Sequence, residues 1–221
     1  MTKLFKKAAL SSAIAAALLV SGTAMAEVEF NIGATSNYLW RGLTQTEDGA
    51  AIQGGIDYSH DSGFYAGAWT SNVKFGDSGY ELDGYFGFGK EFGDLGVDVG
   101  YIYYAYPTFD DSDFGEIYAN LTWKFLSGGV AYTSNAQDAV EAVESAVYYY
   151  IGASTDIPAG LTLGGTIGHT AFDDDSLEDY SHFQISLGKS TDFGDFALTA
   201  DKNDIDGDDD PRVSVSWTKT F

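Results

Sequence analysis

The sequence has 221 residues, of which 44% are hydrophobic, and a formal net charge of −22. So large an excess of acid disfavours nucleic acid as a partner, because the phosphate backbone would be repelled. The chain has no cysteine, which excludes disulfide bonds and thiolate metal sites.

Residues 1–26 have the layout of a cleaved secretory signal peptide. Three lysines precede an apolar run from Ala8 to Val20, and the sequence Ala-Met-Ala ends at Ala26. The run is shorter than the roughly 20 residues that a spanning helix needs, so we prefer cleavage to an uncleaved anchor. Loss of the three lysines takes the formal charge from −22 to −25 and leaves residues 27–221 as one domain.

From residue 27 onward, segments of alternating apolar and polar residues are separated by clusters of Gly, Asp, Ser and Pro. Alternation with period two is typical of strands that have one apolar face. The pattern predicts twelve strands, and the shortness of the seventh and eleventh leaves a count of ten open. In chain order they are 27–41, 51–60, 64–75, 80–92, 96–106, 115–125, 129–135, 146–155, 161–171, 180–191, 196–203 and 212–221.

The predicted connections alternate between short turns and mostly longer, acidic loops. This alternation favours an all-β fold, a transmembrane antiparallel up-and-down β-barrel, with both termini on the short-turn, periplasmic side. Pro107, Pro158 and Pro211 all fall in connections, as expected because proline is excluded from central strands. Within 136–147, the spacing of the apolar residues predicts a helical turn.

The apolar faces of the predicted strands carry none of the 33 acidic residues. A soluble sandwich could also hide acid-free faces, so the placement of aromatic residues is the better test. Aromatic rings gather near both ends of the apolar faces, as in the girdles of outer-membrane barrels. The predicted girdle residues are Tyr38, Trp40, Tyr101, Tyr103, Trp123 and Trp217.

The last strand ends in an alternating pattern formed by Val213, Val215, Trp217 and Phe221. This pattern resembles the C-terminal signal that the barrel-assembly machinery recognises in bacterial outer-membrane proteins. Lys219 departs from it, because an apolar or aromatic residue is usual there. The expected partners are that machinery, periplasmic chaperones, outer-membrane lipid and lipopolysaccharide, with export to the bacterial outer membrane.

Two stretches resemble a known family. The sequence SNYLWRGLTQT at 36–46, followed by AIQGGIDYSHDSGFYAGAWTSNV at 51–73, is similar to the N-terminal signature of the TorF-type porin family. The resemblance implies an outer-membrane, porin-like barrel with a poorly defined substrate, and it implies no catalytic residues.

The opposite faces of the strands supply the predicted pore lining, namely Arg41, Asp57, Lys74, Glu81, Asp83, Asp98, Glu116 and Lys124. Carboxylates around a pore favour cations, so the sequence predicts passive diffusion of small hydrophilic solutes with a mild cation preference. An interior filled by paired acids and bases is the alternative. We expect Arg41 to narrow the pore by pairing with acids such as Glu81 and Asp83.

Three other hypotheses stay open. The acidic stretches 173–179 and 204–211 suggest calcium, but their spacing does not match an EF-hand loop, so neither a metal nor a cofactor is predicted. A hydrolase would use one of three histidines, and only His60-Asp61-Ser62 has a suggestive spacing, in a predicted turn. A barrel that acts in adhesion or envelope structure, without transport, is the third hypothesis. The oligomeric state is not predicted.

Overall fold

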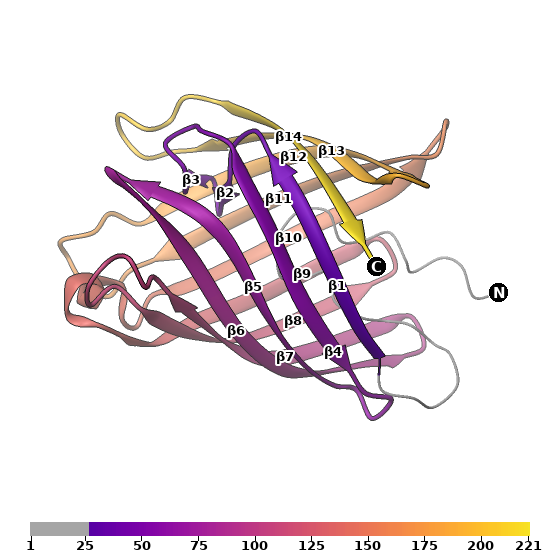
Figure 1. Cartoon of the computed structure of the whole chain (residues 1–221), viewed down its shortest axis with the longest axis horizontal. Helices are drawn as coiled ribbons and strands as arrows, with labels where there is room; N and C mark the ends of the chain where they lie inside the picture. Colours follow the sequence, from indigo (N-terminus) through magenta and orange to yellow (C-terminus); the bar gives the residue numbers. More distant parts are fainter. Residues whose placement is uncertain (1–26) are drawn as a thin grey trace.

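The computed structural model describes residues 27–221, so the predicted signal peptide lies outside the described residues. Twelve antiparallel strands form a closed barrel in the order β1-β14-β13-β12-β11-β10-β9-β8-β7-β6-β5-β4. Figure 1 shows the strands tilted around a common axis, with most long connections gathered at one end. The strands are β1 (Glu27–Thr35), β4 (Ala51–Ser59), β5 (Phe64–Phe75), β6 (Asp77–Phe92), β7 (Leu95–Ala105), β8 (Phe114–Trp123), β9 (Leu126–Ala136), β10 (Val147–Ile157), β11 (Leu161–Ala171), β12 (Tyr180–Thr191), β13 (Gly194–Asn203) and β14 (Arg212–Thr220).

The barrel closes between its first and last strands. In register, β1 pairs with β14 from Asn31 opposite Thr220 to Thr35 opposite Ser216. Beyond the end of β14, the Phe221 N–H donates to the Phe30 carbonyl at 2.8 Å. The predicted count of twelve strands is therefore confirmed, and the pairing of β1 with β14 closes the barrel wall.

The two ends of the barrel differ in their connections. The turn end, where both chain termini of the described part lie, has connections of four residues or fewer, namely 60–63, 93–94, 124–125, 158–160 and 192–193. The loop end has the connections 36–50, 106–113, 137–146, 172–179 and 204–211, together with Gly76 alone between β5 and β6. The predicted helical turn is a 3₁₀ helix at Asp138–Val143. Among residues 27–221, no helix is long and apolar enough to cross a bilayer.

Alternation along each strand separates an apolar outer surface from a polar interior. On β1, Val28, Phe30 and Ile32 are exposed on the outward face, although all three are large and apolar. The same holds around the barrel, where Phe86, Ile151 and Val213 are also exposed. Large apolar residues exposed around the whole circumference are expected where lipid replaces water as the solvent.

The first long connection folds into the barrel. Residues 36–50 leave β1 and form a small hairpin of β2 (Leu39–Trp40) and β3 (Leu43–Thr44), which Figure 1 places within the barrel mouth. The prediction of one strand from 27 to 41 is therefore wrong beyond Thr35. We call residues 36–50 the inner loop. Its packing against inward side chains forms the buried core of the molecule.

Candidate functional site

The interior of the barrel is lined by carboxylates and tyrosines. Inward positions of five strands carry Asp57, Glu81, Asp83, Asp98, Glu116 and Asp201. Tyrosines from other strands donate hydrogen bonds to these groups. Tyr85 of β6 bonds Asp57, and Tyr65 of β5 bonds Asp98.

Amides hold the same two mid-lumen carboxylates from their other side. Asn31 donates to Asp57 at 3.1 Å, and Asn120 donates to Asp98 at 3.1 Å. Tyr150 in turn donates to Asn120 at 3.1 Å. Asp57 and Asp98 are therefore fixed in place by neutral donors, and within residues 27–221 neither of them forms an ion pair with a lysine or arginine.

The tip of the inner loop places Arg41 against the opposite wall. Its two terminal nitrogens donate to the two carboxylate oxygens of Glu116 on β8, at 2.8 and 2.7 Å. The guanidinium lies 4.2 Å from the ring centroid of Trp40 and 4.1 Å from that of Tyr148 on β10. Burial alone would lower the pKa of Arg41, but Glu116 raises it above its ordinary value, so the side chain stays charged.

A second contact of the inner loop covers the Glu81 and Asp83 pair. The Tyr38 hydroxyl donates to Glu81 at 3.1 Å, and its ring meets Trp69 edge-on at 5.5 Å. Both carboxyl groups are fully buried, and one oxygen of each has no hydrogen-bond partner within residues 27–221. Burying such groups without full hydrogen bonding costs free energy, so rehydration of Glu81 and Asp83 favours displacement of the loop.

The third contact depends on a glycine. Gly42 has a φ of 82°, and a Cβ added there would lie 2.6 Å from the Cβ of His182. Its carbonyl accepts a hydrogen bond of 3.1 Å from Asn203 on β13. His182 also contacts the Tyr148 hydroxyl at 2.9 Å, which links this contact to the Arg41 site. Only glycine fits this turn, because it tolerates both the positive φ and the close approach.

Together these contacts seal the loop end of the lumen. Inward side chains at this level, such as Val73, Glu81 and Ile102, are each 1% exposed, and Asn203 is 2% exposed. Inward side chains at the turn end, including Glu91, Thr122 and Thr218, are exposed. Inward side chains are therefore exposed at the turn-end rim, whereas Tyr65 and Tyr118 further along the lumen, and the residues beneath the inner loop, are buried.

A family model described as "Bacterial protein of unknown function (Gcw_chp)" matches residues 20–220. The chain belongs to the Gcw_chp family. Among curated proteins, none matches its sequence.

Two solved structures show the same fold as this Gcw_chp chain. A KdgM porin is similar with a TM-score of 0.59 and 9% identity, over 87% of this chain and 99% of that one. A KdgM porin in complex with disordered oligogalacturonate is similar with a TM-score of 0.55 and 6% identity, over 89% and 98% of the two chains. At these identities the likeness establishes the porin-like, outer-membrane barrel fold of the Gcw_chp chain.

Several predicted site residues of the Gcw_chp chain lie elsewhere than expected. Tyr38 and Trp40 are not outward girdle residues, because both lie inside the barrel, where Trp40 packs against Tyr104 at 5.8 Å. Lys74 is at the loop end of β5, opposite in parity to the inward Trp69, and forms an exposed ion pair of 2.7 Å with Glu47.

Lys124 is likewise not a lining residue of the Gcw_chp barrel. It lies in the turn between β8 and β9 with a φ of 57°, over the ring of Trp123. The predicted pairing of Arg41 with Glu81 and Asp83 is also corrected, since its partner is Glu116. Arg41, Asp57, Glu81, Asp83, Asp98 and Glu116 all lie inside the barrel.

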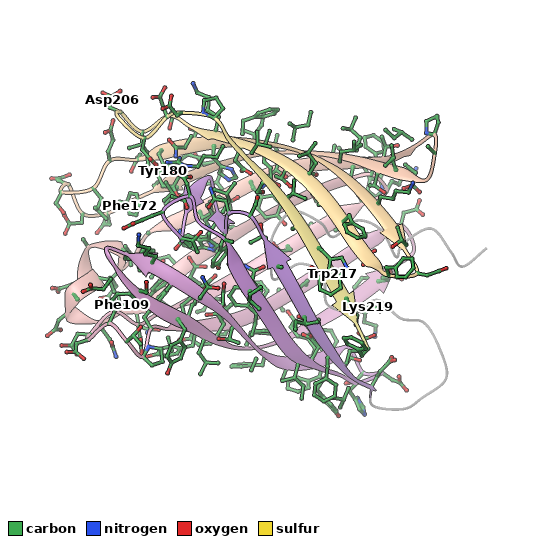
Figure 2. All side chains as sticks on the ribbon, turned by 45° about the horizontal axis from the view of Figure 1, so that its top comes forward. Phe109, Phe172, Tyr180, Asp206, Trp217 and Lys219 are labelled. Atoms are coloured by element: carbon green, nitrogen blue, oxygen red, sulfur yellow. The ribbon has the colours of Figure 1, made fainter. Side chains whose placement is uncertain are left out.

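The other predicted girdle residues are on the outward face of the Gcw_chp barrel. Tyr101 and Tyr103 lie toward the loop end of β7, whereas Trp123 and Trp217 lie at the turn end. Val213, Val215 and Phe221 share the outward face of β14 with Trp217. Figure 2 shows Trp217 and Lys219 together at the turn end, far from Asp206 in a loop.

Lys219, the exception in the terminal pattern, has a specific contact. Its ammonium donates to the carbonyl of Asp192 at 2.8 Å, in the turn that precedes β13. Trp217 donates to the carbonyl of the next residue, Phe193, at 3.1 Å. A lysine is tolerated on this outward face because its charge is held at the rim of the barrel.

The groups considered for catalysis or metal binding form local contacts. His60 Nδ1 lies 2.8 Å from the Ser62 hydroxyl, and the Ser62 N–H also donates to it, within one exposed turn. Within residues 27–221, no three His, Asp or Glu side chains come together in an arrangement that could hold a metal ion.

Sequence reasoning missed the aromatic half of the site. The predicted pore lining contained charged residues only. The structure adds four inward tyrosines, namely Tyr65, Tyr85, Tyr118 and Tyr148. The signal was available, because tyrosine on the polar face of a strand is a hydrogen-bond donor placed among carboxylates.

Proposed function

We propose that this Gcw_chp protein is an outer-membrane channel for passive diffusion of small hydrophilic solutes, with cations preferred, and that the inner loop closes its outer mouth. In this proposal the turn end faces the periplasm. Residues 1–26 direct export, and the barrel-assembly machinery recognises the terminal strand β14 together with Phe221. We also propose that the protein is related to the TorF-type porins and that its outer surface contacts outer-membrane lipid and lipopolysaccharide. No catalytic role is part of it.

The observation that carries the proposal is the acidic lining of the lumen together with the single segment that covers its loop end. At the turn-end rim, inward residues such as Glu91 and Thr122 are exposed. Further in, the carboxylates of Asp57 and Asp98 are held by the neutral amides of Asn31 and Asn120. Carboxylates that line a narrow passage favour cations over anions. Oligogalacturonate is itself a polyanion, so it is not a solute that we propose here.

The burial of inward side chains at the loop end, such as Val73 and Ile102, supports a second candidate function. In that candidate the barrel does not transport solutes and acts in adhesion or envelope structure. In that case the inner loop would be a permanent part of the core. The two candidates differ in one measurable property, because only a channel conducts when its inner loop is removed.

The decisive experiment is conductance of the purified protein in planar bilayers. A variant with residues 39–45 replaced by a short Gly-Ser linker should conduct several-fold more than the unaltered barrel, with a reversal potential in a KCl gradient that indicates cation preference. The matched control shortens the loop 172–179, whose residues 173–179 are all exposed, and should leave conductance unchanged. A folded barrel that stays silent after loop replacement would support the non-transporting candidate.

A further inference from the structure

The pocket that holds the Arg41 guanidinium is built mainly by the barrel wall. Glu116 on β8 supplies both acceptor oxygens, and Tyr148 on β10 covers one face of the cation at 4.1 Å. Tyr104 on β7 donates to Glu116 at 3.2 Å and so orients its carboxylate. Of the contacting groups, only Trp40 travels with the inner loop. If the loop leaves, three walls of the pocket remain in place on rigid strands.

The geometry of this pocket selects a flat cation. Two parallel N–H···O bonds to one carboxylate require the fork of donors that a guanidinium or amidinium group carries. The aromatic face of Tyr148, which stays on β10 when the loop leaves, favours a planar, weakly hydrated cation over a compact ammonium. The pocket therefore has the chemistry of a site for planar organic cations.

The lumen below the pocket leads such cations to it. Asp98 and Asp57 lie on inward faces between the open turn end and Glu116, and both are held by neutral donors. A passage lined by one sign of charge raises the local concentration of the opposite sign. The formal charge of the whole sequence, −22, acts in the same direction.

We infer that the Glu116, Tyr104 and Tyr148 pocket is a binding site for free guanidinium and amidinium compounds, and that Arg41 is a tethered occupant of it. This inference rests on the proposed channel. A solute of this class occupies the pocket when the inner loop is displaced, and it competes with the return of Arg41. The pocket is then the solute-selective point of the channel.

Arg41 is covalently part of the protein, and this attachment determines how binding of a free ligand must be tested. A side chain held on the protein has an effective concentration in the millimolar range or above, so a free ligand competes with it poorly. Arg41→Ala removes the tethered occupant and leaves the wall of the pocket unchanged. This variant, checked for heat-modifiable migration in detergent gels, is the appropriate protein for the measurement.

The experiment compares two probes of equal charge, methylguanidinium and methylammonium, as blockers of current through the Arg41→Ala barrel. We expect half-block by methylguanidinium at a concentration about tenfold lower, because one probe makes the bidentate contact and the other does not. Adding Glu116→Gln to the variant should abolish the difference. Equal block by the two probes, or a preference that survives Glu116→Gln, would overturn the inference.

A second readout separates failure of this inference from failure of the proposed channel. Saturation-transfer NMR on the methyl signal of methylguanidinium reports binding to the Arg41→Ala barrel in detergent without any current. Transfer that is lost with Glu116→Gln supports the binding site even if no variant conducts, in which case the channel proposal alone fails. No transfer above that of methylammonium assigns the pocket to Arg41 only.

Discussion

The two halves of the lumen follow the same strand alternation, yet they differ in access to water. At the loop end, inward residues such as Glu81 and Ile102 are buried at 1% exposure. At the turn end, Glu91 and Thr122 occupy equivalent inward positions and are exposed. The inner loop covers the inward residues at the loop end. Between the two ends, tyrosines of the wall itself, such as Tyr65 and Tyr118, are buried against one another.

The inner loop is therefore the expected barrier to ions and solutes in this barrel. Removal of a few contacts at the loop end should change access to the lumen, whereas equivalent changes at the turn end should alter only its charge. Trypsin offers a common readout, because the peptide bond after Arg41 is shielded while the inner loop is seated and becomes a cleavage site when it is released. Proteolysis of a transiently opened segment follows the population of the open form when reclosing is fast.

The largest effect is expected from Glu116→Gln. The change leaves the Arg41 guanidinium, 12% exposed, without its countercharge, and removing one partner of a buried pair costs about 3–5 kcal/mol. Cleavage after Arg41 and bilayer conductance should both rise. Glu91→Gln is the control, since this exposed carboxylate lies in the open half. Equal protection of Arg41 in both variants would contradict the role of the ion pair.

Gly42→Ala should have the next largest effect. The added Cβ meets the Cβ of His182 at 2.6 Å and imposes a positive φ on alanine, for a combined cost of about 2–4 kcal/mol. We expect faster cleavage after Arg41. Gly207→Ala is the control for a strained alanine elsewhere at the loop end, because Gly207 in the connection 204–211 has a φ of 84° with no atom within 4 Å of an added Cβ. If both variants are cleaved equally fast, close packing on His182 is not what seats the loop.

Asp98→Asn should leave access unchanged and lower cation preference. The replacement preserves the shape of the side chain beside Asn120 but removes one negative charge from the middle of the lumen. In the barrel with residues 39–45 replaced, the reversal potential in a KCl gradient should move toward zero. Asp110→Asn, at an exposed residue of the connection 106–113, is the matched control. An equal shift in both would place selectivity at the mouth.

The smallest effect is expected at the exposed Glu47 and Lys74 pair. Hydrogen bonds from Lys74 and from the Gly76 N–H hold the pKa of Glu47 below its ordinary value. The contact is therefore complete above the ordinary glutamate pKa of about 4.3, and it is lost as the pH falls through the lower folded value. The Gly76 amide shift in NMR should titrate below that value and should not titrate in Glu47→Gln. Conductance should barely change, because exposed pairs contribute little.

The sequence was sufficient for the barrel wall because lipid and lumen impose opposite requirements on alternate residues. Val28 and Phe30 face outward and Asn31 faces the lumen, as period two requires. The turns were predictable for the same reason, since glycine, proline and acidic residues interrupt the alternation. That pattern predicted twelve strands, and it left a count of ten open because two of the predicted segments were short.

The inner loop was not predictable from the same pattern, because Ser36, Tyr38 and Trp40 continue the alternation of β1 by coincidence. A buried ring inside the barrel and a ring facing lipid are both apolar, so alternation does not distinguish them. Strand length does not distinguish them either, since β6 at 16 residues is longer than a strand from 27 to 41. One signal was present: Leu39 is an apolar residue on the otherwise polar face of 27–41, and it pairs with Thr44 in the inner hairpin.

The errors at Lys124 and Lys74 have different origins. Alternation predicts the side of a residue only while the strand continues, and Lys124 already belongs to a two-residue turn. Lys74, in contrast, lies within β5, where the alternation continues to Phe75. The more apolar face of this strand, with Tyr65, Trp69 and Val73, points into the lumen, so Lys74 lies on the outward face. The partner of Arg41 was unpredictable for another reason, because the reach of a folded loop across the lumen depends on three-dimensional packing and not on strand parity.

The seam between β1 and β14 has a consequence for the order of folding. β5 and β6 are joined through Gly76 alone and can pair early, whereas β1 and β14 come from opposite ends of the chain and meet last. Partners of the inner loop lie beside that seam, where Asn203 of β13 holds Gly42 and Arg212 of β14 holds Asp48. Closure of the barrel between β1 and β14 and packing of the inner loop are thus expected to occur in the same kinetic step.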